Sequence, residues 1–199
     1  MNFKQFLVLI VVSCFLSNAY AKSKDVIKVL NHAKDVPELK KKQGYLMFYV
    51  NVDGIAPSIQ FSKISTKKTD FILPDERISF TKDYFLDLKN VTKGFYFIPL
   101  FAGIYQITRI NAPFYDLPYW LPTNKEAKWR FGVEENSINF IGEINIAKER
   151  GVNVIDVNLF NRVATYHEQI IKEIALMPQS FPLKTKSGYR DDFFMELGK

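Results

Sequence analysis

The sequence has few of the residues that usually build metal sites and nucleophilic sites. It contains one cysteine, Cys14, and two histidines, His32 and His167. Neither histidine has a second histidine or a cysteine at the spacing of a zinc site, and the HExxH, GxSxG and Ser-x-x-Lys patterns are absent. We therefore expect no metal and no cofactor, and the sequence names no catalytic residue. A Ser-His-acid triad assembled from distant positions stays open, because such triads are defined by geometry.

The sequence also lacks an apolar run of the roughly 20 residues that a membrane-spanning helix needs. Its longest run, from Phe6 to Leu16, follows Lys4 and precedes the small residues Ala19 and Ala21. This order of charge, apolar run and small residues is typical of a cleavable secretory signal. We predict a signal peptide at residues 1–21 with cleavage after Ala21, a periplasmic or secreted protein, and no transmembrane segment after cleavage.

Cys14 leaves one alternative open, a lipid-anchored surface protein that carries its acyl groups on this cysteine. A lipidated cysteine should close the apolar run, whereas Phe15 and Leu16 continue it here. We therefore expect Cys14 to be removed with the signal. The rest of the chain has no cysteine, so the exported protein must fold without a disulfide.

The excess of positive charge is small and spread along the chain. The sequence has 27 Lys and Arg against 21 Asp and Glu, and its lysines cluster only at 40–42 and 67–68. Short lysine runs are usually solvated, so we do not expect nucleic acid as a partner. The length suits one domain with a proper core. We predict a leader at 22–43, either a short helix or disordered, and a single domain at 44–199.

From Gly44 onward the apolar residues alternate with period two, which indicates strands. The predicted strands cover 45–52, 59–64, 77–88, 95–100, 104–110, 129–133, 138–146 and 152–163. Turn residues separate them, and no helical pattern intervenes until near the C-terminus. Many short strands without crossover helices favour a mainly β fold, an antiparallel Ig-like or transthyretin-like β-sandwich with one C-terminal α-helix.

The C-terminal helix is predicted at about 165–177. Thr165 and Glu168 fit a capping box, in which the Thr165 hydroxyl caps a first-turn amide and Glu168 reaches back to the threonine amide. Its expected apolar face consists of Tyr166, Ile170, Ile171 and Ile174.

Two glycines have predicted structural roles. Gly103, followed two residues later by Tyr105, fits a tyrosine corner, in which the backbone turns and the phenol bonds back to it. Gly142 interrupts the alternating apolar residues of 138–146, and glycine inside a strand often marks a bulge or a close approach. We predict that Gly142 faces one core together with Ile138, Phe140, Ile144 and Ile146. We also predict that an aromatic ring from a neighbouring strand or sheet lies over Gly142.

Three segments resemble a family of uncharacterised exported bacterial proteins with a predicted β-sandwich domain, of carboxypeptidase-regulatory-like or transthyretin-like type. They are LFAGIYQI, FGVEENSINFIGEINI and SGYRDDFF, and the resemblance covers most of residues 44–194. It implies an envelope or periplasmic location. It implies no established activity, so no catalytic residue is carried over from it.

The best candidate interaction surface is an aromatic segment between prolines. Phe114, Tyr115, Tyr119 and Trp120 could present rigid rings to a sugar or a protein partner. The alternative is that these rings cap the end of the core, since the chain has 18 Phe, 10 Tyr and 2 Trp to place. Our first hypothesis is a non-catalytic binding or envelope-associated module, with an unknown protein or carbohydrate partner in the cell envelope.

A secreted hydrolase acting on envelope sugars or peptides is the alternative from a different class. It would need two carboxylates facing one cleft, one of them in an apolar setting that raises its pKa. The candidates for this role are Asp75, Glu76, Glu134, Glu143 and Asp191.

Overall fold

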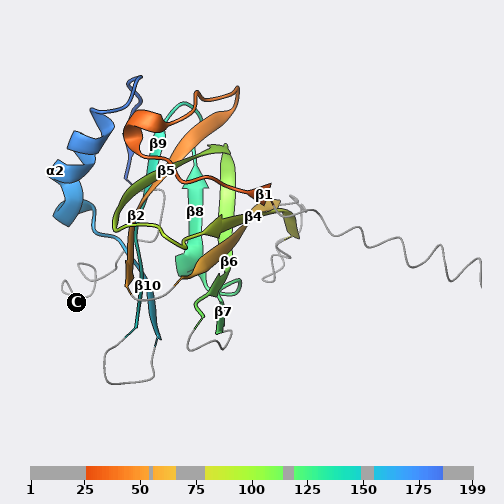
Figure 1. Cartoon of the computed structure of the whole chain (residues 1–199). Coiled ribbons are helices and arrows are strands. Elements are labelled where there is room, and N and C mark those ends of the chain that lie inside the picture. The colour runs from red at the N-terminus through yellow and green to blue at the C-terminus, as the bar shows by residue number, and fades with distance from the viewer. Residues whose placement is uncertain (1–25, 54–55, 66–78, 114–118, 149–154, 186–199) are drawn as a thin grey trace, which may run out of the picture.

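The computed structural model describes residues 26–53, 56–65, 79–113, 119–148 and 155–185 (Figure 1). Several predicted features lie outside these ranges. They are the signal peptide with its cleavage site, Cys14, Phe114, Tyr115, Asp75, Glu76 and Asp191.

Within the described ranges the chain is mainly β with one α-helix, as the period-two pattern predicts. The strands are β1 (Val26–Ile27), β2 (Gln43–Asp53), β3 (Ser58–Ser65), β4 (Ser79–Asp87), β5 (Gly94–Phe101), β6 (Gly103–Asn111), β7 (Trp120–Pro122), β8 (Arg130–Val133), β9 (Ile138–Lys148), β10 (Ile155–Phe160) and β11 (Leu183–Lys184). The helix α2 covers Val163–Ile174, and short 3-10 turns, η1 and η2, cover Ala33–Asp35 and Ala127–Trp129.

The strands form two sheets. Sheet A has the order β1-β4-β3-β6-β7, with β8 also paired to β6, and sheet B has the order β10-β9-β2-β5, with β11 also paired to β9. The main core lies between them, where Phe61 and Tyr105 of sheet A join Phe48, Ile98 and Ile144 of sheet B in one buried cluster. The fold is therefore two stacked sheets held together by apolar burial.

The expectation of purely antiparallel sheets is wrong, because both sheets are mixed. Strands β2 and β9 are parallel neighbours, as are β1 and β4 and also β11 and β9. A parallel pair needs a long crossover connection, usually a helix. Between β2 and β9 the chain makes that crossover with strands, several of them in sheet A. The absence of crossover helices in the sequence therefore does not exclude parallel pairing.

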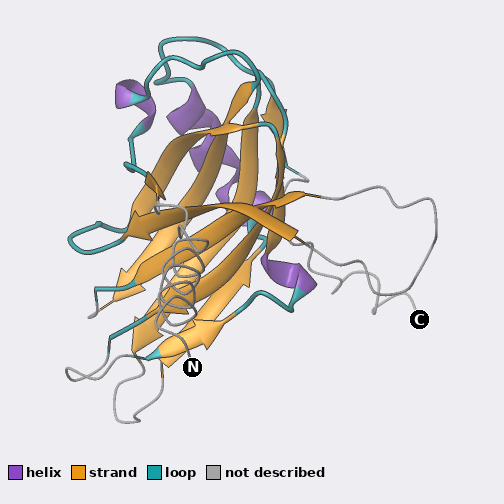
Figure 2. Ribbon diagram, turned by 90° about the vertical axis from the view of Figure 1, so that its right-hand side faces the viewer, coloured by secondary structure: helices purple, strands orange, loops and turns teal. Residues whose placement is uncertain are grey.

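Sheet B is covered on its second face as well, so the molecule has a third layer. Helix α2 packs there through Ile170, against Met47, Phe97 and Phe140. In Figure 2 this helix lies on the far side of the strands. Burial on both faces explains why the middle of β2, from Tyr45 to Val50, and all of β5 lack charged and amide side chains.

The leader is mostly extended where it is described, and η1 is its one short helical turn within those residues. Val26 and Ile27 form β1 beside β4, and a bridge between Asn31 and Phe97 follows. Ala33 is buried in the cluster beneath α2, whereas Val29 is exposed. The helical spacing that begins at Val26 is therefore misleading, because backbone pairing to two sheet edges holds residues 26–31 in extended form.

Helix α2 begins two residues before its predicted start, so the predicted capping box is wrong. Arg162 occupies the N-cap position without a side-chain cap bond, and Thr165 and Glu168 lie inside the helix. Val163 packs against the cluster beneath the helix, which favours the earlier start. Ile171, predicted on the apolar face, is 49% exposed.

The turn between β5 and β6 has the geometry that the tyrosine corner predicts. Gly103 has a φ of 151°, in the region that favours glycine. The Tyr105 hydroxyl donates to the carbonyl oxygen of Phe101 at 2.6 Å, and the Tyr105 ring is fully buried. Burial raises the pKa of Tyr105, so the phenol stays protonated and keeps this bond.

Gly142 lies in a β-bulge that reverses the faces of β9. Opposite β2, Phe140 pairs with Met47 and Glu143 pairs with Tyr49, so two residues of β9 face one of β2. Ile138 and Phe140 consequently lie in the cluster beneath α2, whereas Ile144 lies between the sheets. The prediction that these residues share one core is wrong.

The group over Gly142 is backbone, not an aromatic ring. A Cβ at this position would lie 2.3 Å from the carbonyl oxygen of Phe160 and 3.6 Å from the Cα of Asn161. The end of β10 therefore occupies the space that a side chain would need. The predicted close approach exists, but its partner is the chain that leads into α2.

Candidate functional site

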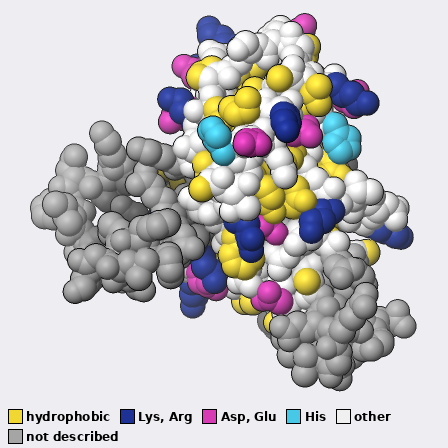
Figure 3. All heavy atoms as spheres, turned by 90° about the vertical axis from the view of Figure 1, so that its left-hand side faces the viewer, with side chains coloured by type: hydrophobic (Ala, Val, Ile, Leu, Met, Phe, Trp, Pro, Cys, Tyr) yellow, Lys and Arg dark blue, Asp and Glu magenta, His cyan; other side chains and the backbone are white. Residues whose placement is uncertain are grey.

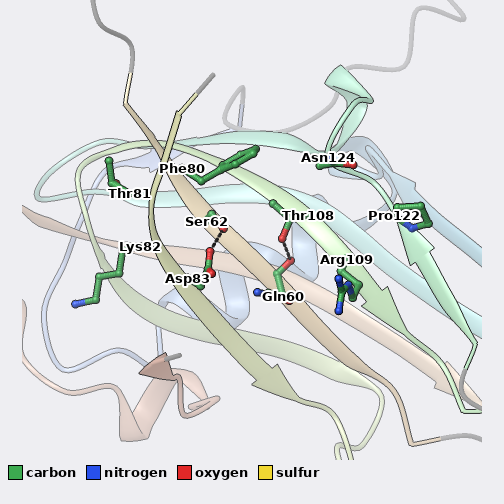
Figure 4. Close-up of a pocket in the computed structure, with 10 residues that line it drawn as sticks. All are labelled: Gln60, Ser62, Phe80, Thr81, Lys82, Asp83, Thr108, Arg109, Pro122 and Asn124. Atoms are coloured by element: carbon green, nitrogen blue, oxygen red, sulfur yellow. Dashed lines mark hydrogen bonds between the residues drawn. The ribbon is translucent and has the colours of Figure 1, made fainter. Parts of the chain in front are cut away.

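A polar hollow on the outer face of sheet A is the best candidate site. Its cavity volume is about 400 Å³, within the range of small-molecule sites. The lining residues come from β3, β4, β6 and the segment from β7 onward: Gln60, Ser62, Phe80, Thr81, Lys82, Asp83, Thr108, Arg109, Pro122 and Asn124 (Figure 4).

Two β-bulges of sheet A open onto this hollow. Between β3 and β4 the register shifts so that Thr81 is the extra residue, and between β3 and β6 the extra residue is Thr108. Both threonines line the hollow. Bulges bend a strand and re-aim its side chains, and they are over-represented beside functional sites. The hollow therefore lies where two β-bulges, at Thr81 and Thr108, bend the strands of sheet A.

The floor of the hollow is held by hydrogen bonds across three strands. The Ser62 hydroxyl, which is almost fully buried, donates to one carboxylate oxygen of Asp83. The Thr108 hydroxyl donates to the carbonyl oxygen of Gln60 at 3.2 Å. Among the described residues, none forms a hydrogen bond with the Gln60 side-chain amide or with the second oxygen of Asp83. The Gln60 amide and the second oxygen of Asp83 are therefore hydrogen-bonding groups, held on fixed strands, that a ligand in the hollow could use.

Arg109 connects the hollow to the predicted aromatic segment. Its guanidinium carbon lies 5.0 Å from the centre of the Trp120 ring, a cation–π distance. Trp120 is 58% exposed and Tyr119 is 44% exposed. These two described rings of the segment therefore do not cap the core. Trp120 instead borders the hollow through Arg109.

A second, larger hollow of about 640 Å³ is a weaker candidate. It is lined by Lys42, Lys63, Phe101, Ala102, Val133, Glu134 and Glu135. Lys63 already donates to the carbonyl oxygen of Ala102 at 2.7 Å, and Glu134 forms an ion pair with Lys184 at 3.0 Å. Much of its charge is therefore partnered within the protein.

Glu143 is the more buried of the two hydrolase candidates in the described ranges, and it lies elsewhere, between sheet B and α2. One oxygen accepts from Arg162 at 2.9 Å and from Tyr166 at 3.0 Å, and the other accepts from Asn51 at 3.1 Å. The Glu143 side chain is 4% exposed. Its lone pairs are occupied by protein donors, so it ties α2 to the sheet and has no open side for a substrate.

The hydrogen bond from Tyr166 to Glu143 predicts a loss of stability at alkaline pH. Burial first, and then this bond, raise the pKa of Tyr166 to about 12. The unfolded chain releases the proton near pH 10, so the stability from Tyr166 is complete below pH 10 and is lost as the pH rises to about 12.

We expect Tyr166→Phe to flatten this dependence, measured as the free energy of unfolding by denaturant at several values between pH 9 and pH 12. Part of the slope should remain, because burial also raises the pKa of Tyr45, Tyr49 and Tyr84. Parallel curves for the two proteins would contradict this role of Tyr166.

The face that carries α2 has acidic and basic side chains interspersed with apolar ones (Figure 3). No group of three or more His, Cys, Asp or Glu residues in the described ranges is placed to hold a metal ion. None of the helices in those ranges has the length and apolar character that a bilayer-spanning helix needs.

The polar residues of the hollow are not predicted as a site from the sequence. Gln60 and Ser62 occupy the alternate positions of β3 that a period-two pattern assigns to the outer face, which is the one available signal. Their neighbours Asp83 and Arg109 lie on strands whose order the sequence does not state.

Comparison with protein-family models, with curated proteins and with solved structures gave no match.

Proposed function

We propose that the protein is an exported, non-catalytic binding module of Ig-like or transthyretin-like β-sandwich type, which holds a polar ligand of the cell envelope on the outer face of sheet A. The observation that carries this proposal is the hollow itself. Both bulged residues of the sheet open onto it, and side chains with unused donors and acceptors line it.

The geometry favours binding over catalysis in this hollow. Among its described lining residues Asp83 is the single carboxylate, whereas glycoside hydrolysis needs two across the scissile bond. Of the other hydrolase candidates in the described ranges, Glu143 is enclosed and Glu134 is paired with Lys184 on the surface. Glu134 and Glu135 both line the second hollow, but they are neighbours in the chain and Glu134 is already paired with Lys184.

The two tryptophans allow a direct binding test. Trp120 is 58% exposed beside the hollow, whereas Trp129 is fully buried, so a bound ligand should shield Trp120 from a soluble quencher such as acrylamide. We would titrate the protein with a panel of neutral sugars, uronic acids, amino acids, dipeptides and nucleotides. At least one class should reduce quenching, and Trp120→Phe should abolish that change.

Matched cation variants locate the site. Arg109→Gln should weaken binding, whereas Lys128→Gln should leave it unchanged, because Lys128 lies over Trp129 at 5.5 Å instead. If no compound class protects Trp120, or if Arg109→Gln and Lys128→Gln weaken binding equally, the proposal is wrong.

A further inference from the structure

We infer that the ligand of the sheet A hollow is a neutral saccharide, an inference that rests on the proposed function and names its ligand class. The first reason is the balance of charge. Asp83 and Arg109 face the hollow from β4 and β6, while the Lys82 side chain extends away from the other labelled residues (Figure 4). The lining contains one carboxylate and two cations, and because the Lys82 side chain extends away, Asp83 and Arg109 leave little excess charge inside the hollow to attract an anion or a cation.

The second reason is the type of hydrogen-bonding group. The free oxygen of Asp83 accepts, the guanidinium of Arg109 donates, and the amide of Gln60 does both. In Figure 4 these three side chains form a row across β4, β3 and β6. A sugar has hydroxyl groups on adjacent carbons, each of which donates and accepts, so such a row can hold two or more of them at once.

The third reason is the presence of aromatic surface beside polar groups. Phe80 lines the hollow and is 40% exposed, and Trp120 lies against Arg109 at the border. A sugar ring has C–H faces that pack on such rings while its hydroxyls reach the strands. Amphipathic walls of this kind fit a saccharide better than a fully charged ligand.

The backbone argues against an extended peptide as the occupant. A peptide usually adds to a sheet by pairing with an exposed edge strand. The hollow lies over β3 and β6, which pair with strands on both sides, and over residues 80–83 of β4, which pair with β3 alone because β1 reaches only Tyr84 and Phe85. The backbone amides and carbonyls of β3 and β6 are committed to the sheet, so side chains must supply the recognition across the floor of the hollow.

The test is isothermal titration calorimetry of the full-length protein. The probes are glucose, galactose, mannose and N-acetylglucosamine with their β-linked or α-linked oligomers, glucuronate as the anionic comparison, and dialanine as the peptide comparison. We expect binding of at least one neutral sugar series and weaker binding of glucuronate.

Asp83→Asn and Arg109→Gln should each raise the dissociation constant of that sugar at least tenfold, because each removes a charge-assisted hydrogen bond. Asp156→Asn on β10 of sheet B is the matched control and should leave it unchanged. Far-UV circular dichroism and the melting temperature verify that each variant is folded. Arg109, an exposed side chain, supplies the test if Asp83→Asn unfolds.

The outcomes separate the two proposals. Sugar binding that both variants weaken supports the saccharide assignment. Binding of glucuronate or dialanine alone, weakened by Arg109→Gln, overturns the assignment and leaves a binding module with another ligand. If none of these probes binds in the hollow, the saccharide assignment fails, and the binding module fails as well only if no class of the wider quenching panel protects Trp120.

Discussion

Gly142→Ala should lower the free energy of unfolding by about 3 kcal/mol, which we would measure by denaturant titration. The new Cβ would lie 2.3 Å from the carbonyl oxygen of Phe160, a backbone atom that cannot move aside by changing rotamer. The φ of Gly142 is 120°, a conformation that other residues rarely adopt. Backbone strain costs about 1–3 kcal/mol and overpacking a further 1–3 kcal/mol.

Gly132→Ala on β8 is the matched control for this substitution. Nothing lies within 4 Å of the position that its Cβ would take, so stability should change by less than about 1 kcal/mol. Equal effects of the two substitutions would mean that the close contact between β9 and the end of β10 is not present in solution.

Glu143→Ala should also cost about 3 kcal/mol of unfolding free energy. It removes the acceptor shared by Arg162, Tyr166 and Asn51. Removing one partner of a buried ion pair typically costs about 3–5 kcal/mol, because the other is left uncompensated. The lower end applies here, since Arg162 is 45% exposed and water can solvate its charge.

Glu134→Ala is the comparison for the buried acid. Glu134 pairs with Lys184 on the surface, where the two side chains are 64% and 43% exposed. Such pairs contribute less than about 1 kcal/mol. Hydrogen exchange should also show faster exchange of α2 amides in Glu143→Ala, with little change in Glu134→Ala. Unaltered exchange in α2 would contradict the view that Glu143 ties the helix to sheet B.

These two predictions share one structural cause. Without the bulge at Gly142, alternation would place Glu143 on the face opposite Ile138 and Phe140. The extra residue instead turns Glu143 toward α2, below Arg162 and Tyr166. Gly142 thereby determines where Glu143 lies. From the sequence alone, Glu143 is a hydrolase candidate with no connection to the glycine.

The existence of the strands could be predicted from the sequence, whereas their partners could not. The period-two pattern places strands within a few residues of β2, β3, β5, β6 and β9. It contains no information on whether β2 pairs with β9 in parallel, because that depends on contacts between segments far apart in the chain. The change of face along β9 could not be predicted for the same reason, because the backbone group over Gly142 comes from β10.

The start of α2 illustrates how distant contacts override a local signal. Thr165 and Glu168 satisfy the capping pattern, yet the helix begins at Val163. The residues just before that start and in the first turn, Arg162 and Val163, are held by Glu143 and by the cluster beneath the helix. Local capping contributes about 1 kcal/mol, which the longer-range contacts exceed.

The candidate site was accessible from the sequence only in part. Composition pointed to Tyr119 and Trp120, and both are exposed. The sequence does not identify Gln60, Asp83 and Arg109 as site residues, because single polar residues on separate strands have the pattern of ordinary solvent-facing positions. They become a site only when the sheet order brings β4, β3 and β6 together.

The measurement that tests the binding face most directly is a two-dimensional NMR titration of the 15N-labelled protein with its best-binding sugar. Our account predicts shifts in the amides of β3, β4 and β6 around the hollow and in the indole N–H of Trp120, while the indole N–H of buried Trp129 and the amides of α2 stay unchanged. Shifts confined to α2 and sheet B, or no shifts at all, would contradict it.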